Sequence, residues 1–167
     1  MYIGIDPGLK GAIATYNEET DILKIYPMPV KDGRINVEEL DGLMYFISSE
    51  SMHNKNCICV IEKSQAMPGQ GSVSGFTIGY GYGVIIGLIT SNGIPYTEVR
   101  PHTWKKHFSL SLGSKYSKKE KKAASIAKAK ELYPGVSLKP SSRSRVDSDG
   151  LAEAVLIMHY GMNLTAS

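Results

Sequence analysis

The order of strand-like and helix-like segments predicts an α/β fold, in which helices flank a mixed five-stranded sheet of three antiparallel strands followed by parallel strands. Three strand-like runs follow one another at the N-terminal end, and helices alternate with strands after them. This order is typical of a mixed sheet covered on both faces. The length of 167 residues suits one domain of roughly 100–200 residues, so we expect residues 1–167 to form a single domain.

The three N-terminal runs are expected to pair as an antiparallel meander. Residues 2–6 form a short apolar run that ends in Asp-Pro-Gly, and residues 11–16 form a second run. Residues 22–30 resemble a third strand that contains Pro27 and Pro29. Because proline has no N–H to donate to a neighbouring strand, the third strand lies at an edge or ends early.

The middle of the chain predicts one helix followed by two further strands. Residues 57–62 form a continuous apolar run, as a buried central strand does, and residues 94–99 form the other strand. The helix covers residues 37–49, because four apolar side chains recur there on one helical face: Leu40, Leu43, Met44 and Ile47.

A glycine stripe marks the segment between those two strands. Glycine recurs every four residues, at Gly75, Gly79, Gly83 and Gly87. The surrounding residues are apolar without proline, which favours a helix over a glycine-rich loop. Each glycine inside a helix costs about 1 kcal/mol relative to alanine, so we expect a close neighbour: the sheet, a second subunit or nucleic acid. The stripe is our candidate subunit interface.

Two more helices are predicted at the C-terminal end. Ser117 and Glu120 have the spacing of a capping box, and the helix that they open runs to about Tyr133, where a Pro-Gly pair stops it. The last helix begins near Asp149, and three apolar residues share one of its faces: Leu151, Val155 and Met158.

Positive charge is concentrated in one part of a chain whose net formal charge is only +3. Residues 100–145 contain 13 Lys or Arg and two acids, Glu120 and Glu131, whereas the rest is net acidic. Such a basic segment indicates a polyanion partner, nucleic acid above all. The alternative is an ordinary solvated helix face that is rich in lysine.

Four carboxylates are candidate metal ligands. Asp6 and Glu62 each close an apolar strand, and they face one another if the two strands are neighbours. Asp149 and Glu153 are four apart and share one face of the last helix, and Asp147 lies just before it. Because clustered carboxylates repel, hard divalent cations suit them. Two ions about 3.5–4 Å apart stabilise the attacking and leaving oxygens of a phosphodiester.

Each acid also has an ordinary structural interpretation. Asp6 suits a turn, and Glu62 suits an ion pair with Lys63 or Lys105. Asp149 suits a helix cap, and Glu153 suits a solvated acid in the first helical turn. The coincidence of all four acids with a basic segment favours a metal-dependent nuclease.

Composition also limits where the protein works. Cys57 and Cys59 are the only cysteines and sit too close along a strand to bridge readily, which suits a reducing cytoplasm. The longest apolar run, residues 84–89, is far shorter than the roughly 18 residues of a membrane span. We therefore expect no membrane partner, and the N-terminal residues show no secretion signal.

Four blocks in order resemble RuvC-type Holliday junction resolvases. Residues 3–8 and 11–14 resemble that family's first hairpin, an opening shared with actin-like kinases and YqgF-type nucleases. The Pro-x-x-Trp-Lys motif at 101–105 and the glycine stripe are closest to the phage-type and chloroplast-type branch. Residues 60–63 and 149–154 extend the resemblance over nearly the whole chain.

The resemblance implies an RNase H-like fold, a homodimer, and Mg²⁺-dependent nicking of two strands of a four-way DNA junction, in the host cytoplasm for a phage-encoded enzyme. Asp6 and Glu62 match the first two acids of the family. Asp149 and Glu153 match its last pair, although bacterial RuvC spaces that pair three apart and not four, so Asp147 remains an alternative to Asp149. Two Mg²⁺ ions are expected, with Mn²⁺ as a substitute.

The basic residues have expected roles as well. Lys105 steadies the scissile phosphate or makes an ordinary backbone contact. Phe76, Tyr80 and Tyr82 beside the glycine stripe are expected mainly in the core, with stacking on an opened junction as the alternative. The DNA-binding residues are expected to contact phosphates without reading sequence: Lys105, Lys106, Lys115, Lys118, Lys119, Lys121, Lys122 and Arg143.

Other functions fit part of the pattern. An RNase H-like nuclease that acts on RNA or hybrid duplexes keeps the fold and the acids, but it leaves the glycine stripe unexplained. A non-catalytic module that binds branched DNA leaves the acids unexplained. The sequence does not predict which nucleotides flank the cut.

Overall fold

A five-stranded sheet forms the centre of the computed structural model, which describes residues 1–52, 57–65, 69 and 71–165. Its order is β3-β2-β1-β6-β7. The antiparallel strands are β1 (Tyr2–Asp6), β2 (Ala12–Asn17) and β3 (Ile22–Pro27). Two further strands, β6 (Ile58–Glu62) and β7 (Tyr96–Val99), continue the sheet in parallel with β1. The predicted mixed sheet is therefore confirmed.

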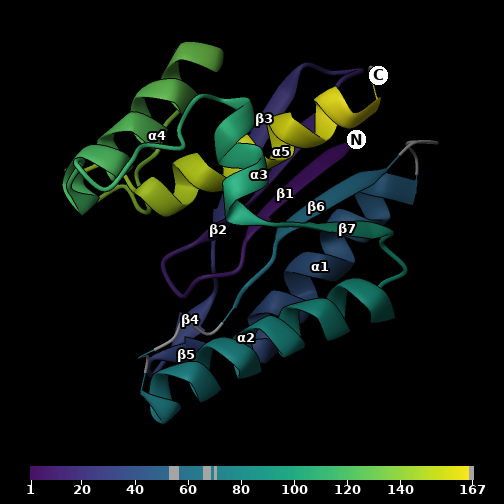
Figure 1. Ribbon diagram of the computed structural model, residues 1–167. Coiled ribbons are helices and arrows are strands. Elements are labelled where there is room, and N and C mark those ends of the chain that lie inside the picture. Colours follow the sequence, from purple (N-terminus) through teal and green to yellow (C-terminus); the bar gives the residue numbers. More distant parts are fainter. Residues whose placement is uncertain (53–56, 66–68, 70, 166–167) are drawn as a thin grey trace.

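Helices cover both faces of this sheet (Figure 1). On one face lie α1 (Val37–Met52) and α2 (Ser72–Ser91). On the other lie α3 (Pro101–His107), α4 (Lys118–Leu132) and α5 (Asp149–Thr165). Because successive side chains of a strand point to opposite faces, each strand contributes to two separate apolar cores.

Glycine lets α5 pack directly on the N-terminal strand. A Cβ atom on Gly4 would overlap the backbone nitrogen of Met158 and the carbonyl oxygen of Ala154. A Cβ on Gly150 would likewise overlap the carbonyl oxygen of Lys10 in the β1–β2 turn. These two glycines therefore permit the close contact that brings the start of α5 to the edge where β1 ends.

Two short elements were not predicted from the sequence. A hairpin of β4 (Val30–Lys31) and β5 (Arg34–Ile35) follows β3, and the turn residues Asp32 and Gly33 have φ values of 51° and 73°. Asp-Gly is a strong signal for such turns, but the strands are too short to show alternation. The seven-residue α3 is likewise too short for a helical period.

The glycine-striped segment is helical, as predicted, and little of it is buried. Only Gly81, Ile85 and Ile89 are buried among its 20 residues. A Cβ atom on Gly79, Gly83 or Gly87 would meet nothing within 4 Å, so the sheet is not the neighbour that these three glycines accommodate. At these three positions, the described part of the chain leaves the glycine stripe open to a partner.

The aromatic residues beside the stripe depart from the expected core packing. Phe76 is 73% exposed and Tyr80 is 43% exposed, and the two rings stack on each other with centroids 6.3 Å apart. Tyr82 is half-buried and donates a hydrogen bond to Glu98. The prediction was therefore wrong for Phe76 and Tyr80, because the described part of the chain leaves both side chains exposed on their side of α2.

By length and composition alone, α2 is long and apolar enough to cross a bilayer, and little of it is buried within the structure. The glycines and tyrosines of α2 interrupt its apolar runs, so no uninterrupted run in the sequence has the length of a membrane span. The same apolarity suits a helix that packs on a sheet with one side and on a partner with the other.

Candidate active site

Asp6 and Glu62 lie at the same edge of the sheet. β1 and β6 are parallel neighbours, with Ile5 opposite Ile61, so the next residue of each strand is one of the two acids. Asp6 Oδ1 accepts a hydrogen bond from the backbone N–H of Gly8 at 3.1 Å. The prediction that these two strands are neighbours is confirmed.

Trp104 holds Glu62 in place. Its Nε1–H donates to Glu62 Oε2 at 2.7 Å, and its ring is fully buried. Pro101 at the start of α3 supplies a fixed φ angle that suits the first helical turn. The short helix therefore presents Trp104 to the sheet and the adjacent Lys105 to the acids.

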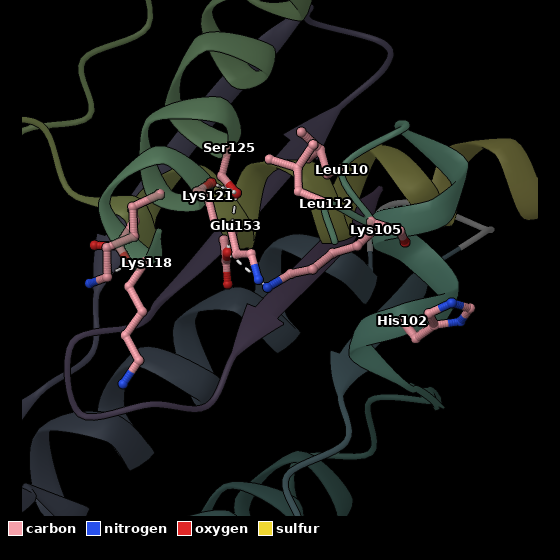
Figure 2. Close-up of a pocket in the computed structure, with 11 residues that line it drawn as sticks. His102, Lys105, Leu110, Leu112, Lys118, Lys121, Ser125 and Glu153 are labelled. Carbon is pink, nitrogen blue, oxygen red and sulfur yellow. Dashed lines mark hydrogen bonds and ion pairs between the residues drawn. The ribbon is translucent and has the colours of Figure 1, made fainter. Parts of the chain in front are cut away.

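Glu153 reaches this edge from the first turns of α5. Its Oε1 lies 3.0 Å from Lys105 Nζ and accepts a hydrogen bond from Ser125 Oγ of α4 at 3.2 Å. Figure 2 shows Lys105 extending from α3 toward the Glu153 carboxylate. Lys105 Nζ also lies 4.9 Å from the Trp104 ring centroid. The Lys105 ammonium group therefore contacts both an aromatic ring of α3 and a carboxylate of α5.

Asp149 and Asp147 have different surroundings. Asp149 Oδ2 pairs with Lys122 Nζ at 2.9 Å, next to Glu153 on the same side of α5. Asp147 Oδ2 pairs instead with Lys130, near the C-terminal end of α4. Of these two aspartates, Asp149 is the one that the structure places beside the other acids.

Burial and mutual repulsion act on the acids at the sheet edge. The pKa of Asp6 is raised to about 7, mainly by burial. The charges of Glu153 and Glu62 also raise this pKa, whereas the Gly8 N–H and Lys105 lower it. Burial also raises the pKa of Glu62 against the Trp104 hydrogen bond, and Glu153 adds to the increase. Asp6, Glu62 and Glu153 are therefore close enough to interact electrostatically, with Lys105 as their counter-charge.

These side chains fit a hard divalent cation in chemical type, since every candidate donor is a carboxylate oxygen. Within the residues that the structure describes, no three Asp, Glu, His or Cys side chains are gathered tightly enough to hold an ion as they stand. Lys105 and Lys122 supply positive charge to Glu153 and Asp149. Buried carboxylates that repel one another are stabilised by a cation.

A basic cavity of about 540 Å³ adjoins Glu153 and Asp149. Four of the eight predicted DNA-binding residues line it: Lys105, Lys118, Lys121 and Lys122. Figure 2 shows Lys118, Lys121 and Ser125 coming from α4, and the His102 ring directed away from Glu153. The remaining four are exposed and lie outside this cavity: Lys106, Lys115, Lys119 and Arg143.

Sequence reasoning gave no role to two side chains that position the acids. For Trp104 the sequence does offer an indication of a role, because it is the only tryptophan and directly precedes Lys105. For Ser125 the sequence offers no such indication, because a serine among the alanines of a basic helix does not reveal that it faces Glu153. Its partner lies 28 residues away in the sequence.

Comparison with known proteins supports the architecture. No protein-family model matches the chain, and a search of curated proteins finds no match. Thermus thermophilus RuvC is similar in structure, with a TM-score of 0.51, 16% identity, and coverage of 98% of this chain and 95% of that one.

Two further solved structures are similar. T. thermophilus RuvC in complex with a Holliday junction substrate gives a TM-score of 0.53 at 13% identity, with 98% and 94% coverage. The yeast mitochondrial Holliday junction resolvase Ydc2 gives 0.48 at 17% identity, with 98% and 78% coverage. Together with the strand order β3-β2-β1-β6-β7, the likeness to RuvC establishes that this chain has the RuvC-like form of the RNase H-like fold.

Proposed function

We propose that this protein is a structure-selective DNA endonuclease that resolves four-way junctions by symmetric, metal-dependent nicking as a homodimer in the cytoplasm. One observation carries the proposal: Asp6, Glu62 and Glu153 interact at one edge of the sheet, beside a cavity lined by four lysines. The fold is shared with RuvC, which has been solved with a Holliday junction substrate. Cleavage of a phosphodiester uses negative charge to hold metal ions and positive charge to bind the phosphate, and acids beside lysines provide both.

The proposed metal ligands are Asp6, Glu62, Asp149 and Glu153. Divalent ions, Mg²⁺ or Mn²⁺, would activate a water molecule and neutralise charge on the phosphate there. Asp6 contributes a carboxylate at the end of β1, and the Trp104 hydrogen bond orients Glu62. A bound cation would favour the ionised form of Asp6, because its positive charge would offset the increase in pKa that burial causes.

The lysines are proposed to bind the DNA backbone. Lys105 leaves Glu153 to contact the scissile phosphate, where its charge stabilises the negative charge that develops during cleavage. Lys118, Lys121 and Lys122 hold the flanking phosphates in the adjoining cavity, and the exposed Lys106, Lys115, Lys119 and Arg143 extend this surface. Phosphate contacts of this kind position the duplex arms and do not read sequence.

The experiment is cleavage of a synthetic four-way junction beside a linear duplex of the same sequence, with Mg²⁺ or with EDTA. We expect paired nicks in the junction alone, abolished by EDTA. Asp6→Asn should bind the junction and fail to cut it. Asp147→Asn is the matched control and should cut normally, because Asp147 pairs with Lys130 outside the acid cluster.

Several outcomes would contradict the proposal. Full cleavage by Asp6→Asn would remove Asp6 from the site. Preferential cutting of RNA or of an RNA–DNA hybrid would indicate the RNase H-like alternative. Junction binding without cutting under either Mg²⁺ or Mn²⁺ would indicate a non-catalytic binding module.

A further inference from the structure

The hairpin of β4 and β5 lies at the same edge of the sheet as the acids. In the register of the sheet, Asp6 is opposite Ala12 and Ala12 is opposite Pro27, so β3 leaves the sheet where β1 ends. The backbone N–H of Met28 donates to Gly11 O at 3.0 Å, which ties the start of the hairpin to the β1–β2 turn. Figure 1 shows β4 and β5 at this end of the sheet, beside α2.

The hairpin has a fixed position against α2. The two apolar residues that flank its tip, Met28 and Ile35, are buried in the core that α1 and α2 cover. Ile35 lies so close to α2 that a Cβ atom on Gly81 would meet its Cγ1 at 3.4 Å. The backbone N–H of Asn36 donates to Pro29 O at 2.9 Å and closes the hairpin. A buried base therefore holds the exposed tip in place.

Two cations lie opposite each other across this hairpin. Lys31 pairs with Arg34 in the register, and both side chains are exposed. Within the described part of the chain, no carboxylate lies within 4 Å of the charged group of either residue. Like charges directly opposite each other on neighbouring strands are destabilising. The hairpin therefore has two positive charges available to an anion from outside the chain.

Two acids border the hairpin as well. Asp32 forms its turn, with a φ of 51°. Glu38 lies in the first turn of α1, where the helix N-terminus stabilises a carboxylate. Together with Lys31 and Arg34, these acids line a cavity of about 550 Å³. This balance of charge suits a single phosphate group, in contrast to the lysine-lined cavity, which suits several.

We infer that Lys31 and Arg34 hold a backbone phosphate of the DNA on the opposite side of the acids from the lysine-lined cavity. The inference rests on the proposed function. The lysine-lined cavity is formed by α3, α4, α5 and the loop after α3, whereas the hairpin packs on the face that α1 and α2 cover. The planar guanidinium of Arg34 can donate to two phosphate oxygens, and Lys31 adds a second positive charge. The DNA is thus held on both sides of the bond that is cut.

The distance between the hairpin and the acids suits a neighbouring phosphate. Adjacent strands are about 4.7–4.9 Å apart, so Pro27, two strands away from Asp6, begins the hairpin roughly 10 Å from it. The grooves of B-form DNA are about 6 and 12 Å wide, so a duplex with one phosphate at Asp6 has others within reach of the hairpin. Composition does not reveal this surface, because the residues outside the basic segment are net acidic.

The test replaces single phosphates on both sides of the mapped nick in a four-way junction by neutral methylphosphonates and measures binding in EDTA. We expect the affinity of the wild type to fall several-fold when the phosphate that the hairpin holds is replaced. The variant that combines Lys31→Ala and Arg34→Ala should lose this sensitivity and reduce the slope of log affinity against log salt by about 2, one for each cation. Lys118→Ala should instead lose the sensitivity to phosphates on the other side of the nick.

Lys24→Ala is the matched control. Lys24 lies on β3 and is paired with Glu50 at 2.7 Å, so its removal should leave both the sensitivity pattern and the salt slope of the wild type. Lys31→Glu separates DNA binding from folding, because it places opposite charges across the hairpin. Its thermal stability should equal or exceed that of the wild type, while its junction affinity falls further than that of Lys31→Ala.

Three results would overturn the inference alone, for a wild type that binds and nicks the junction. One is the same methylphosphonate sensitivity in the wild type and in the double variant. Another is a salt slope that the double variant leaves unchanged. The third is a hairpin-dependent phosphate on the same side of the nick as those that depend on Lys118. A wild type that binds and nicks no junction overturns the proposed function as well.

Discussion

Asp6 carries an electrostatic penalty in the metal-free protein. Its pKa is raised from 3.8 to about 7, mainly by burial and in smaller part by the nearby charges of Glu153 and Glu62. An acid whose folded-state pKa is raised holds its proton more tightly in the folded state. Its stabilising contribution is complete below pH 4 and is lost as the pH rises from about 4 to about 7.

Asp6→Asn should therefore stabilise the metal-free protein above pH 7. One pKa unit corresponds to about 1.4 kcal/mol, so we expect a gain on the order of 2–4 kcal/mol at pH 8 that shrinks toward zero near pH 4. Urea denaturation in EDTA at several pH values measures it. Asp147→Asn, which loses a surface ion pair with Lys130, should show no such gain. An Asp6→Asn variant that is no more stable than wild type at pH 8 would contradict the burial argument.

The sequence predicted the neighbouring positions of Asp6 and Glu62 better than it predicted the side chains that contact them. Asp6 and Glu62 follow apolar strands, which is a local pattern that needs no tertiary knowledge. Their partners Trp104 and Lys105 come from α3, about 40 residues beyond Glu62, so no spacing rule connects them. The acid cluster thus depends on long-range contacts that periodicity does not reveal.

At the scale of elements, the contact of α5 with β1 depends on the absence of a side chain at Gly4. Gly4→Ala should destabilise the protein by about 2 kcal/mol or more, because its Cβ overlaps the α5 backbone and not a side chain that can move. Gly42→Ala in α1, where a Cβ meets nothing within 4 Å, should stabilise by roughly 0.5–1 kcal/mol. Thermal unfolding measures both. Equal effects of the two substitutions would refute the close packing.

Long elements were predicted well, and short ones were not. The bounds of α4 agree because Ser117 and Glu120 form the predicted capping box, and α5 begins at Asp149 as expected. By contrast, α3 is stabilised by the burial of Trp104 against the sheet. Tertiary packing of this kind leaves no periodic pattern in seven residues.

At the scale of the whole molecule, the open side of α2 is the proposed dimer surface. Gly79→Leu should shift sedimentation from dimer to monomer, because its side chain holds two helices apart. Gly42→Leu adds the same bulk to another helical glycine with open space around it and should leave the dimer intact. An unchanged dimer in Gly79→Leu would place the interface elsewhere. Flotation of the protein with lipid vesicles would instead assign this apolar side to a bilayer.

The basic segment should make DNA affinity strongly dependent on salt. Each phosphate that a lysine neutralises releases counterions. Lys118→Ala and Lys121→Ala should each weaken binding similarly for all sequences and reduce the slope of log affinity against log salt by about 1. Lys24→Ala, which removes a lysine paired with Glu50 outside the segment, is the control. A change in sequence preference without a change in the salt slope would contradict the proposed contacts of these lysines with phosphates.

The packing of α5 on β1 also determines when activity can arise during synthesis. The acids come from both the first strand and the last helix, and Glu153 emerges from the ribosome well after Asp6 and Glu62. One face of β1 stays uncovered until α5 is available to pack on Gly4. Under the proposed function, a nascent chain that carries only the earlier acids has an incomplete site and cannot yet cut DNA near a translating ribosome.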